Sequence, residues 1–197
     1  MNAKKLALYV VVRSYYRQAF VSYPNVHYLE NDSVEIDGVR FLGATFWSSF
    51  NCFGLDRQLA IMEEIHYYCA DFQYIKIDDN NRQFVPSDML TLHNESRVFL
   101  QSELPKYDPK KTVVVTHFPP LFQLKHGTIR VDIGTAYFQA HALDIVEEHK
   151  PAFWLYGHNH WSENKVISAT RFVSNQPGYP KEDDSLRRYR KDLVLKI

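Results

Sequence analysis

The chain has 197 residues, of which 45% are hydrophobic and 15% aromatic, and its 23 basic residues balance its 23 acidic ones. This length suits one domain with a substantial core. The basic run at residues 187–191 follows acidic residues at 182–184 and is expected to be a solvated loop, so no extended electrostatic surface for nucleic acid or an anionic membrane is expected. The apolar run at residues 6–12 is too short to span a bilayer and precedes no small-residue cleavage site, so we expect a cytoplasmic protein.

The first part of the chain is predicted to form short strands joined by turns. Residues 6–12 fit either a buried strand or the start of an apolar helix, and the aromatic stretch at 13–22 is ambiguous. Short strands are expected between residues 26 and 37. Asp37-Gly38 is a strong signal for a hairpin turn, and it leads into another strand at residues 39–46.

Helices are predicted for the middle of the chain. Apolar residues recur near helical spacing over residues 55–68. Ser87 is a suitable N-cap for a helix over residues 88–104, which Pro105 would end. Cys52 and Cys69 lack the spacing of a metal site, which favours free thiols.

The second half contains a predicted strand–helix–strand unit. Residues 112–116 and 152–156 are apolar throughout, as the strands of parallel sheets are, and a helix is expected between them at residues 136–149. Such a unit places its two strands parallel, with a right-handed crossover. Closing antiparallel strands are expected at residues 165–167, 171–174 and 193–197.

Each strand of this unit ends in histidine. His117 follows the first, and Gly157-His158-Asn159-His160 follows the second. The carboxyl ends of neighbouring parallel strands meet at one edge of the sheet, and Gly157 is expected to let the backbone turn sharply there. Imidazole is a ligand of zinc, iron and manganese, so His117, His158 and His160 form a predicted metal site. The alternative for a single strand-end histidine is a polar cap held by a hydrogen bond.

Two further residues are candidate substrate contacts. His126 lies in the loop after His117, from which it could reach an anionic substrate, and Tyr179 lies in a Pro- and Gly-rich turn near the end of the chain. The alternatives are an exposed loop histidine and a packing tyrosine. Structural roles are expected for the other histidines, which are His27, His66, His93, His141 and His149.

These motifs resemble the calcineurin-like metallophosphoesterases. Residues 113–117 are similar to that family's fourth motif, an apolar strand ending in a ligand histidine, and residues 157–160 match its fifth, Gly-His-x-His. Residues 29–43 and 173–180 are similar to a bacterial and phage-type branch of the family. The resemblance covers residues 24–197, nearly the whole chain.

The resemblance implies an α/β fold of layered β-sheets flanked by helices, formed by residues 24–197 after an atypical segment at 1–23. It also implies hydrolysis of a phosphomonoester or phosphodiester by a hydroxide held between two divalent ions, manganese, iron or zinc. In this assignment His117 and His158 bind one metal and His160 the other, while Asn159 is a variable position. The substrate would be a phosphorylated small molecule or a phosphodiester.

The front motifs of that family have no counterpart here. They are Asp-x-His, Gly-Asp-x-x-Asp and Gly-Asn-His-Glu/Asp, whereas the first 24 residues contain no Asp, His or Gly. Neutral imidazoles do not offset the repulsion between two divalent ions about 3.5–4 Å apart. We therefore expect an N-terminally truncated enzyme with fewer than two metals and little or no activity. The alternative is a non-catalytic remnant that forms a homo-oligomer or pairs with a chain supplying the missing half-site.

Overall fold

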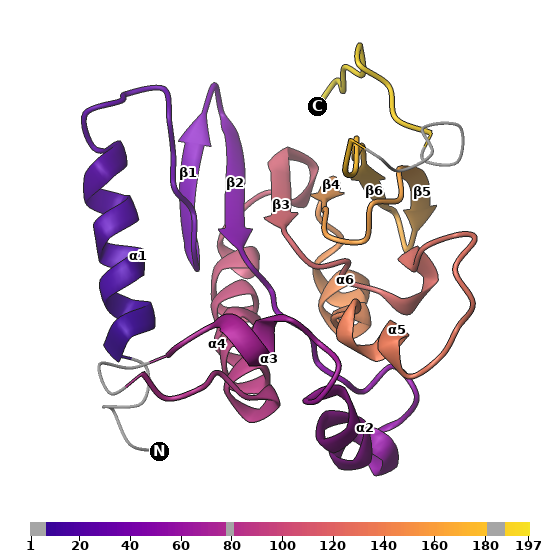
Figure 1. Cartoon of the computed structure of the whole chain (residues 1–197). Coiled ribbons are helices and arrows are strands. Elements are labelled where there is room, and N and C mark those ends of the chain that lie inside the picture. The colour runs from indigo at the N-terminus through magenta and orange to yellow at the C-terminus, as the bar shows by residue number, and fades with distance from the viewer. Residues whose placement is uncertain (1–6, 78–80, 181–187) are drawn as a thin grey trace.

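A mixed six-stranded sheet, in the order β1-β2-β3-β4-β6-β5, organises the chain. The computed structural model describes residues 7–77, 81–180 and 188–197 (Figure 1). The strands are β1 (Asp32–Ile36), β2 (Val39–Ala44), β3 (Thr112–Thr116), β4 (Phe153–Leu155), β5 (Glu163–Ile167) and β6 (Thr170–Ser174). The α-helices are α1 (Ala7–Phe20), α2 (Gln58–Ile65), α3 (Asp71–Tyr74), α4 (Pro86–Glu103), α5 (Gly134–Tyr137) and α6 (Leu143–His149).

The predicted hairpin at Asp37-Gly38 is confirmed. Strands β1 and β2 pair antiparallel, with Ile36 opposite Val39. Asp37 and Gly38 have φ of 51° and 78°, the left-handed pair of torsions that two-residue hairpin turns require. This turn leads the chain from the edge strand β1 back to β2, which lies between β1 and β3 in the sheet.

The predicted strand–helix–strand unit is also confirmed. Strand β3 has the expected bounds, and it pairs parallel with both β2 and β4. The connecting helix is shorter than predicted, because the chain between α5 and α6 bonds to the loop after β3 instead. The amides of Ala140 and Ala142 donate to the carbonyls of Pro119 and Pro120 at 2.9 Å each. The break in the predicted helix, between α5 and α6, keeps residue 140 beside the loop that follows β3.

Helices α4 and α6 cover one face of the sheet (Figure 1). The fully buried Trp154 of β4 lies at the centre of this layer, where its indole Nε1–H donates to the Thr116 hydroxyl at 3.0 Å. Burial of this apolar area is the main stabilising term for such a layer. The strand and helix residues of this core include Leu42, Val114, Trp154, Phe172, Leu100, Leu104, Ile145 and Val146.

The opposite face carries a smaller cluster, formed by Val113, Phe153 and Val173, against which Leu193 and Leu195 pack. The strand predicted at residues 193–197 is wrong. Strand β6 pairs with β4 on one side and β5 on the other, so neither of its edges is open to another strand. The segment instead covers apolar surface with its leucines.

A second core lies among the helices between β2 and β3 and the short helix α5 that follows β3. It joins α2, α3, α5 and the first half of α4 around buried aromatic and aliphatic side chains, namely Phe50, Ile61, Met62, Ile65, Phe72, Ile77, Phe84, Met89, Leu92, Ala136 and Tyr137. The helix predicted at residues 55–68 is present as a 3-10 turn, η2 (Leu55–Arg57), followed by α2. This helical layer supplies one wall of the site described below.

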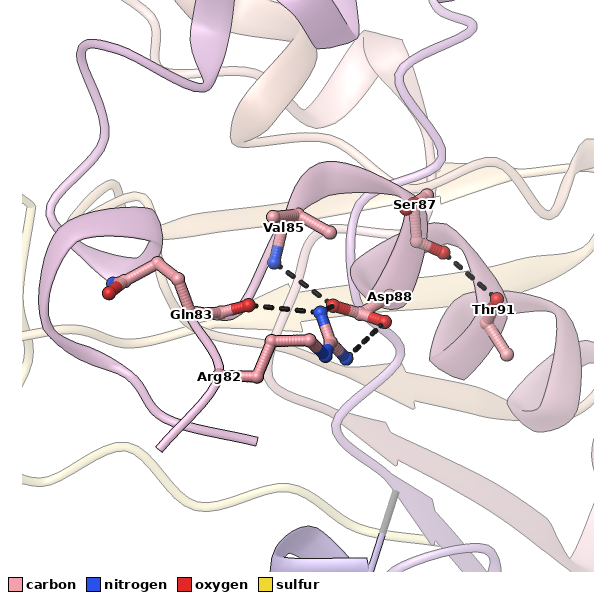
Figure 2. A network of polar contacts seen from close by, with 6 residues as sticks. All are labelled: Arg82, Gln83, Val85, Ser87, Asp88 and Thr91. Carbon is pink, nitrogen blue, oxygen red and sulfur yellow. Dashed lines mark hydrogen bonds and ion pairs between the residues drawn. The ribbon is translucent and has the colours of Figure 1, made fainter. Parts of the chain in front are cut away.

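Helix α4 begins one residue before the predicted N-cap. Pro86 occupies its first position, and the carboxylate of Asp88 accepts a hydrogen bond from the Val85 amide at 3.1 Å (Figure 2). Ser87 lies inside the first turn, so its prediction as N-cap is wrong. A proline without an amide hydrogen fits the first helical position, and this fixes the start.

The ambiguous segment at the front of the chain forms helix α1, beside the edge strand β1 (Figure 1). Arg13 and Arg17 donate to the Glu30 carbonyl at 2.7 and 3.0 Å. Among the described residues, no helix is long and apolar enough to cross a membrane. The second sheet that the resemblance implies is not among the described elements, and the domain division at residue 24 stays a prediction.

Candidate functional site

The carboxyl ends of β2, β3 and β4 are tied together by backbone hydrogen bonds. The amides of His117 and Phe118 both donate to the Thr45 carbonyl at 3.2 Å, and the Gly157 amide donates to the His117 carbonyl at 3.0 Å. Thr45 is fixed in turn, since its amide and hydroxyl donate to the buried Glu30 carboxylate at 2.9 and 2.6 Å. These bonds therefore fix the backbone positions of the residues that follow the three strands.

His117 and His158 meet at this edge, as the sequence predicts. Nδ1 of His158 lies 3.0 Å from Nε2 of His117, and the ring centroids are 4.8 Å apart. One of these nitrogens donates to the other, because two lone pairs would repel each other at this distance. The two imidazoles form one unit between β3 and β4.

The ring of His158 is enclosed by aromatic side chains. Phe118 lies against it with a centroid distance of 3.9 Å, and Phe138 follows at 5.1 Å. This desolvation lowers the pKa of His158 to about 3, with smaller contributions from His117 and His160. Its Nε2 atom is buried and has no hydrogen-bond partner among the described residues. His117 is more open to solvent, and desolvation lowers its pKa as well.

The turn after β4 is made by the histidines and not by Gly157. His158 and His160 have φ of 71° and 53°, whereas Gly157 has no positive φ. A Cβ atom at Gly157 would come no closer than 3.6 Å to its neighbours. The expectation that Gly157 provides the sharp turn is therefore wrong. Left-handed torsions in two non-glycine residues store backbone strain, which surrounding contacts must hold.

Those contacts come from two buried amide side chains, Asn159 and Gln176. Gln176 accepts a hydrogen bond from the His160 amide at 2.9 Å through Oε1, and its Nε2 lies 2.9 Å from Asn159 Oδ1, 3.1 Å from the Trp161 carbonyl and 2.6 Å from the Ser174 hydroxyl. Asn159 donates to the Leu124 carbonyl at 2.9 Å. Asn159 thus joins the turn to the loop after β3, although the resemblance implies a variable position there.

His160 takes a different direction from the other two histidines. Its ring packs edge-on against Tyr179, with a centroid distance of 4.5 Å. Within the described residues, no three His, Cys, Asp or Glu side chains come together as a metal-binding group. An ion that displaced the proton shared by His117 and His158 would find two ligand nitrogens 3.0 Å apart, close enough for both to bind it at about 2.0–2.1 Å. The described residues therefore fit part of a one-metal site and do not fit a two-metal centre.

A cavity of about 1030 Å³ opens beside the histidine pair. All five predicted site residues line it, which places His126 and Tyr179 near the histidines: His117, His126, His158, His160 and Tyr179. His126 is held by its loop, because its Nδ1 accepts from the amides of Thr128 and Ile129 at 3.2 Å each. Its ring also packs against Trp161, with a centroid distance of 4.9 Å.

The helical layer contributes residues that the sequence pattern does not reveal. Asp71, at the start of α3, lines the cavity and accepts a hydrogen bond from the Tyr137 hydroxyl at 2.7 Å. Burial and this carboxylate together raise the pKa of Tyr137. The charge of Asp71 also favours the protonated form of His117. Asp71 lies 46 residues before His117 in the sequence, so no local spacing connects the two.

Comparison with known proteins gives a shared fold and one distant relative. No protein-family model matches the chain. An uncharacterized protein of Acanthamoeba polyphaga mimivirus is 27% identical over 175 residues, which cover 85% of this chain and 60% of that protein. The solved structure of phosphopantetheinyl hydrolase (PptH) from Mycobacterium tuberculosis has a TM-score of 0.56 and 18% identity, over 78% of this chain and 54% of the hydrolase. The chain therefore spans between half and two thirds of the length of these proteins.

Proposed function

We propose that this protein is a phosphoesterase of the calcineurin-like type by descent, which binds a phosphate ester beside His117 and His158. The observation that carries the proposal is the meeting of these two side chains, 3.0 Å apart, at the carboxyl ends of adjacent parallel strands over a large cavity. Ligand sites of α/β proteins form at this position. We further propose that the 197-residue chain by itself hydrolyses the ester slowly or not at all.

The fold shared with a solved hydrolase supports the first part of the proposal. In the layered architecture of metallophosphoesterases, the six-stranded sheet would be one of two. The facing nitrogens of the histidine pair, His158 Nδ1 and His117 Nε2, support a ligand held between the two rings.

One divalent ion, zinc, manganese or iron, would be held by His117 and His158. Such an ion supplies Lewis-acid stabilisation of charge on the phosphoryl oxygens when it is bound. His160, His126 and Tyr179 line the same cavity and would contact the substrate. The described residues place no carboxylate between the histidines to bridge a second ion, and this is why we propose weak activity.

Elemental analysis of the purified protein and a turnover assay test this proposal together. We expect at most one divalent ion per chain, lost in His158→Ala and retained in His141→Ala, a matched histidine that does not line the cavity. Hydrolysis of 4-nitrophenyl phosphate and bis(4-nitrophenyl) phosphate with added Mn²⁺ should be slow. Rapid turnover abolished by His158→Ala would contradict the proposed impairment, and a metal-free protein after incubation with Mn²⁺ or Zn²⁺ would contradict the metal site.

A second candidate function is that of an interaction protein, which assembles with itself or with a complementing chain. Large apolar side chains on and after α1 are exposed: Tyr15 by 66%, Val21 by 80% and Tyr23 by 57%. Exposed apolar surface of this kind favours association. Light scattering over a range of concentrations separates the two candidates, because a monomer at every concentration would contradict self-association.

A further inference from the structure

We infer that the cavity beside the histidine pair selects a phosphodiester that carries an apolar or aromatic group. The inference rests on the proposed function, since it names the class of phosphate ester that the same cavity takes. It is carried by the size of the cavity, by exposed apolar side chains on its wall and by the charged side chains that line it.

The cavity is larger than a phosphate group needs. Its volume of about 1030 Å³ is at the upper end of the range of roughly 300–1,000 Å³ found for sites that take drug-sized ligands. The histidines occupy only the part at the ends of β3 and β4. The remaining space accommodates an organic group attached to the phosphate.

The wall of that space is apolar and accessible. Tyr68 is 73% exposed, Ile129 63%, Phe138 41% and Tyr179 66%, and all four line the cavity. The wall begins at the histidines, because Phe138 lies 5.1 Å from the His158 ring and Tyr179 lies 4.5 Å from the His160 ring, as centroid distances. Large apolar side chains exposed around one cavity favour an apolar ligand, which would remove them from water.

In the protein without bound metal, the charges of the lining favour a monoanion over a dianion. Among the described residues of the lining, Lys125 is the one lysine or arginine, whereas Asp71 and Asp132 are both carboxylates. Each carboxylate opposes every negative charge that the ligand carries. A phosphomonoester is largely a dianion at neutral pH, and a phosphodiester is a monoanion. The diester therefore meets less repulsion, and its second ester group adds apolar area for the wall.

Calorimetric titration of the full chain, freed of metal by dialysis against EDTA, with four probes tests the inference without requiring turnover. The probes are diphenyl phosphate, dimethyl phosphate, phenyl phosphate and inorganic phosphate. We expect the dissociation constant of diphenyl phosphate to be lower than that of each other probe by a factor of about five or more. One or two aromatic contacts supply a gain of this size. Equal binding of dimethyl and diphenyl phosphate would overturn the apolar part, and tighter binding of phenyl phosphate would overturn the diester part.

Variants on the wall connect the preference to this cavity. Tyr68→Ser and Ile129→Ser should weaken diphenyl phosphate about fivefold and leave dimethyl phosphate unchanged. Tyr74→Ser is the matched control, because Tyr74 is 78% exposed in the neighbouring helix α3 and does not line the cavity. An equal effect of all three variants would overturn the inference. Asp132→Asn should raise the affinity for phenyl phosphate more than that for diphenyl phosphate.

The outcomes for the two proposals are separable. If the expected order of affinities holds while the protein takes up no divalent ion after incubation with Mn²⁺ or Zn²⁺, the proposed metal site fails and the cavity preference stands. If hydrolysis depends on His158 while the four probes bind equally, the function stands and the cavity preference fails. Absence of binding by any probe overturns the inference.

Discussion

Two parts of this molecule are held by polar networks of different chemistry, one made of uncharged amides and one of an ion pair. In the turn after β4, Gln176 and Asn159 satisfy a buried loop with uncharged amides. At the start of α4, Arg82 and Asp88 form a two-bond ion pair at 2.8 and 3.0 Å, with side chains that are 30% and 13% exposed (Figure 2). Burying an ion costs far more than burying an amide. The buried turn is therefore held by uncharged amides, and the ion pair lies at the more exposed helix start.

The difference in burial predicts a difference in consequence. Loss of an amide in the turn leaves buried backbone and hydroxyl groups unpaired beside His158 and His160, where water does not replace the lost partner. Loss of the carboxylate at the helix start leaves groups that solvent reaches. Breaking the first network should therefore affect stability and site geometry together, whereas breaking the second should loosen one helix end.

Gln176→Leu breaks the first network at nearly constant volume. It removes hydrogen bonds to the His160 amide, the Trp161 carbonyl, Asn159 and Ser174. We expect the free energy of unfolding to fall by about 3 kcal/mol, the cost of unpaired buried groups, as measured by urea denaturation.

Gln73→Leu is the matched control, since Gln73 is exposed and donates one hydrogen bond, to the Tyr67 carbonyl. It should change the unfolding free energy by less than about 0.5 kcal/mol. Imidazole NMR signals of His158 and His160 should move in the Gln176 variant alone. Similar losses of unfolding free energy in both variants would contradict the proposal that Gln176 stabilises the turn after β4.

Acidification acts on α4 through a buried histidine, His93, as it acts on the turn after β4 through His158. His93 packs on Phe46 and lies 2.7 Å from the Trp47 carbonyl through Nδ1, and burial lowers its pKa to about 3. In the unfolded chain its pKa is about 6.5. The unfolded state therefore binds more protons between these values.

The contribution of His93 to stability is complete above pH 6.5 and is lost as the pH falls toward 3. The slope approaches about 1.4 kcal/mol per pH unit. Denaturation curves of wild type and His93→Asn, measured from pH 7 to pH 5, should differ in this slope. Parallel profiles would show that His93 takes up its proton without unfolding.

The comparison also shows what the sequence could predict. His117 and His158 were predictable because apolar runs mark parallel strands, and the ends of such strands meet. Gln176 was not, because a glutamine 16 residues after His160 has no periodic or motif signal, and only the fold brings its amide into the turn. Asp71 was missed for the same reason.

The errors at other elements have local causes. Ser87 was chosen as a cap on residue type, while Pro86, which prefers the first helical position, carried the better signal. The leucines at 193 and 195 alternate as strand residues do, but β6 already has both neighbours, so they cover a sheet face instead. The alternation of apolar residues in a sequence does not show whether the neighbouring strand already has a partner on each edge.

Asp88→Asn tests the charged network. The amide retains an acceptor for the Val85 amide and loses the charge that pairs with Arg82 and favours a helix N-terminus. We expect a loss of about 1 kcal/mol in unfolding free energy, reduced at high salt because the pair is partly exposed. Hydrogen exchange should increase in the first turn of α4 and stay unchanged at His158. A loss that is independent of salt would contradict an electrostatic role.

Ser87→Ala should have the smallest effect, and it separates the predicted cap from the observed one. Only the backbone carbonyl of Ser87 enters the network, as the acceptor for the Thr91 hydroxyl at 2.9 Å, and alanine keeps that carbonyl (Figure 2). A true N-cap serine replaced by alanine costs about 1 kcal/mol, whereas an exposed position inside the first turn costs less than about 0.5 kcal/mol. Urea denaturation of Ser87→Ala and Asp88→Asn shows whether α4 starts at Pro86 or is capped by Ser87. If Ser87 caps the helix, Ser87→Ala should lower the unfolding free energy more than Asp88→Asn does.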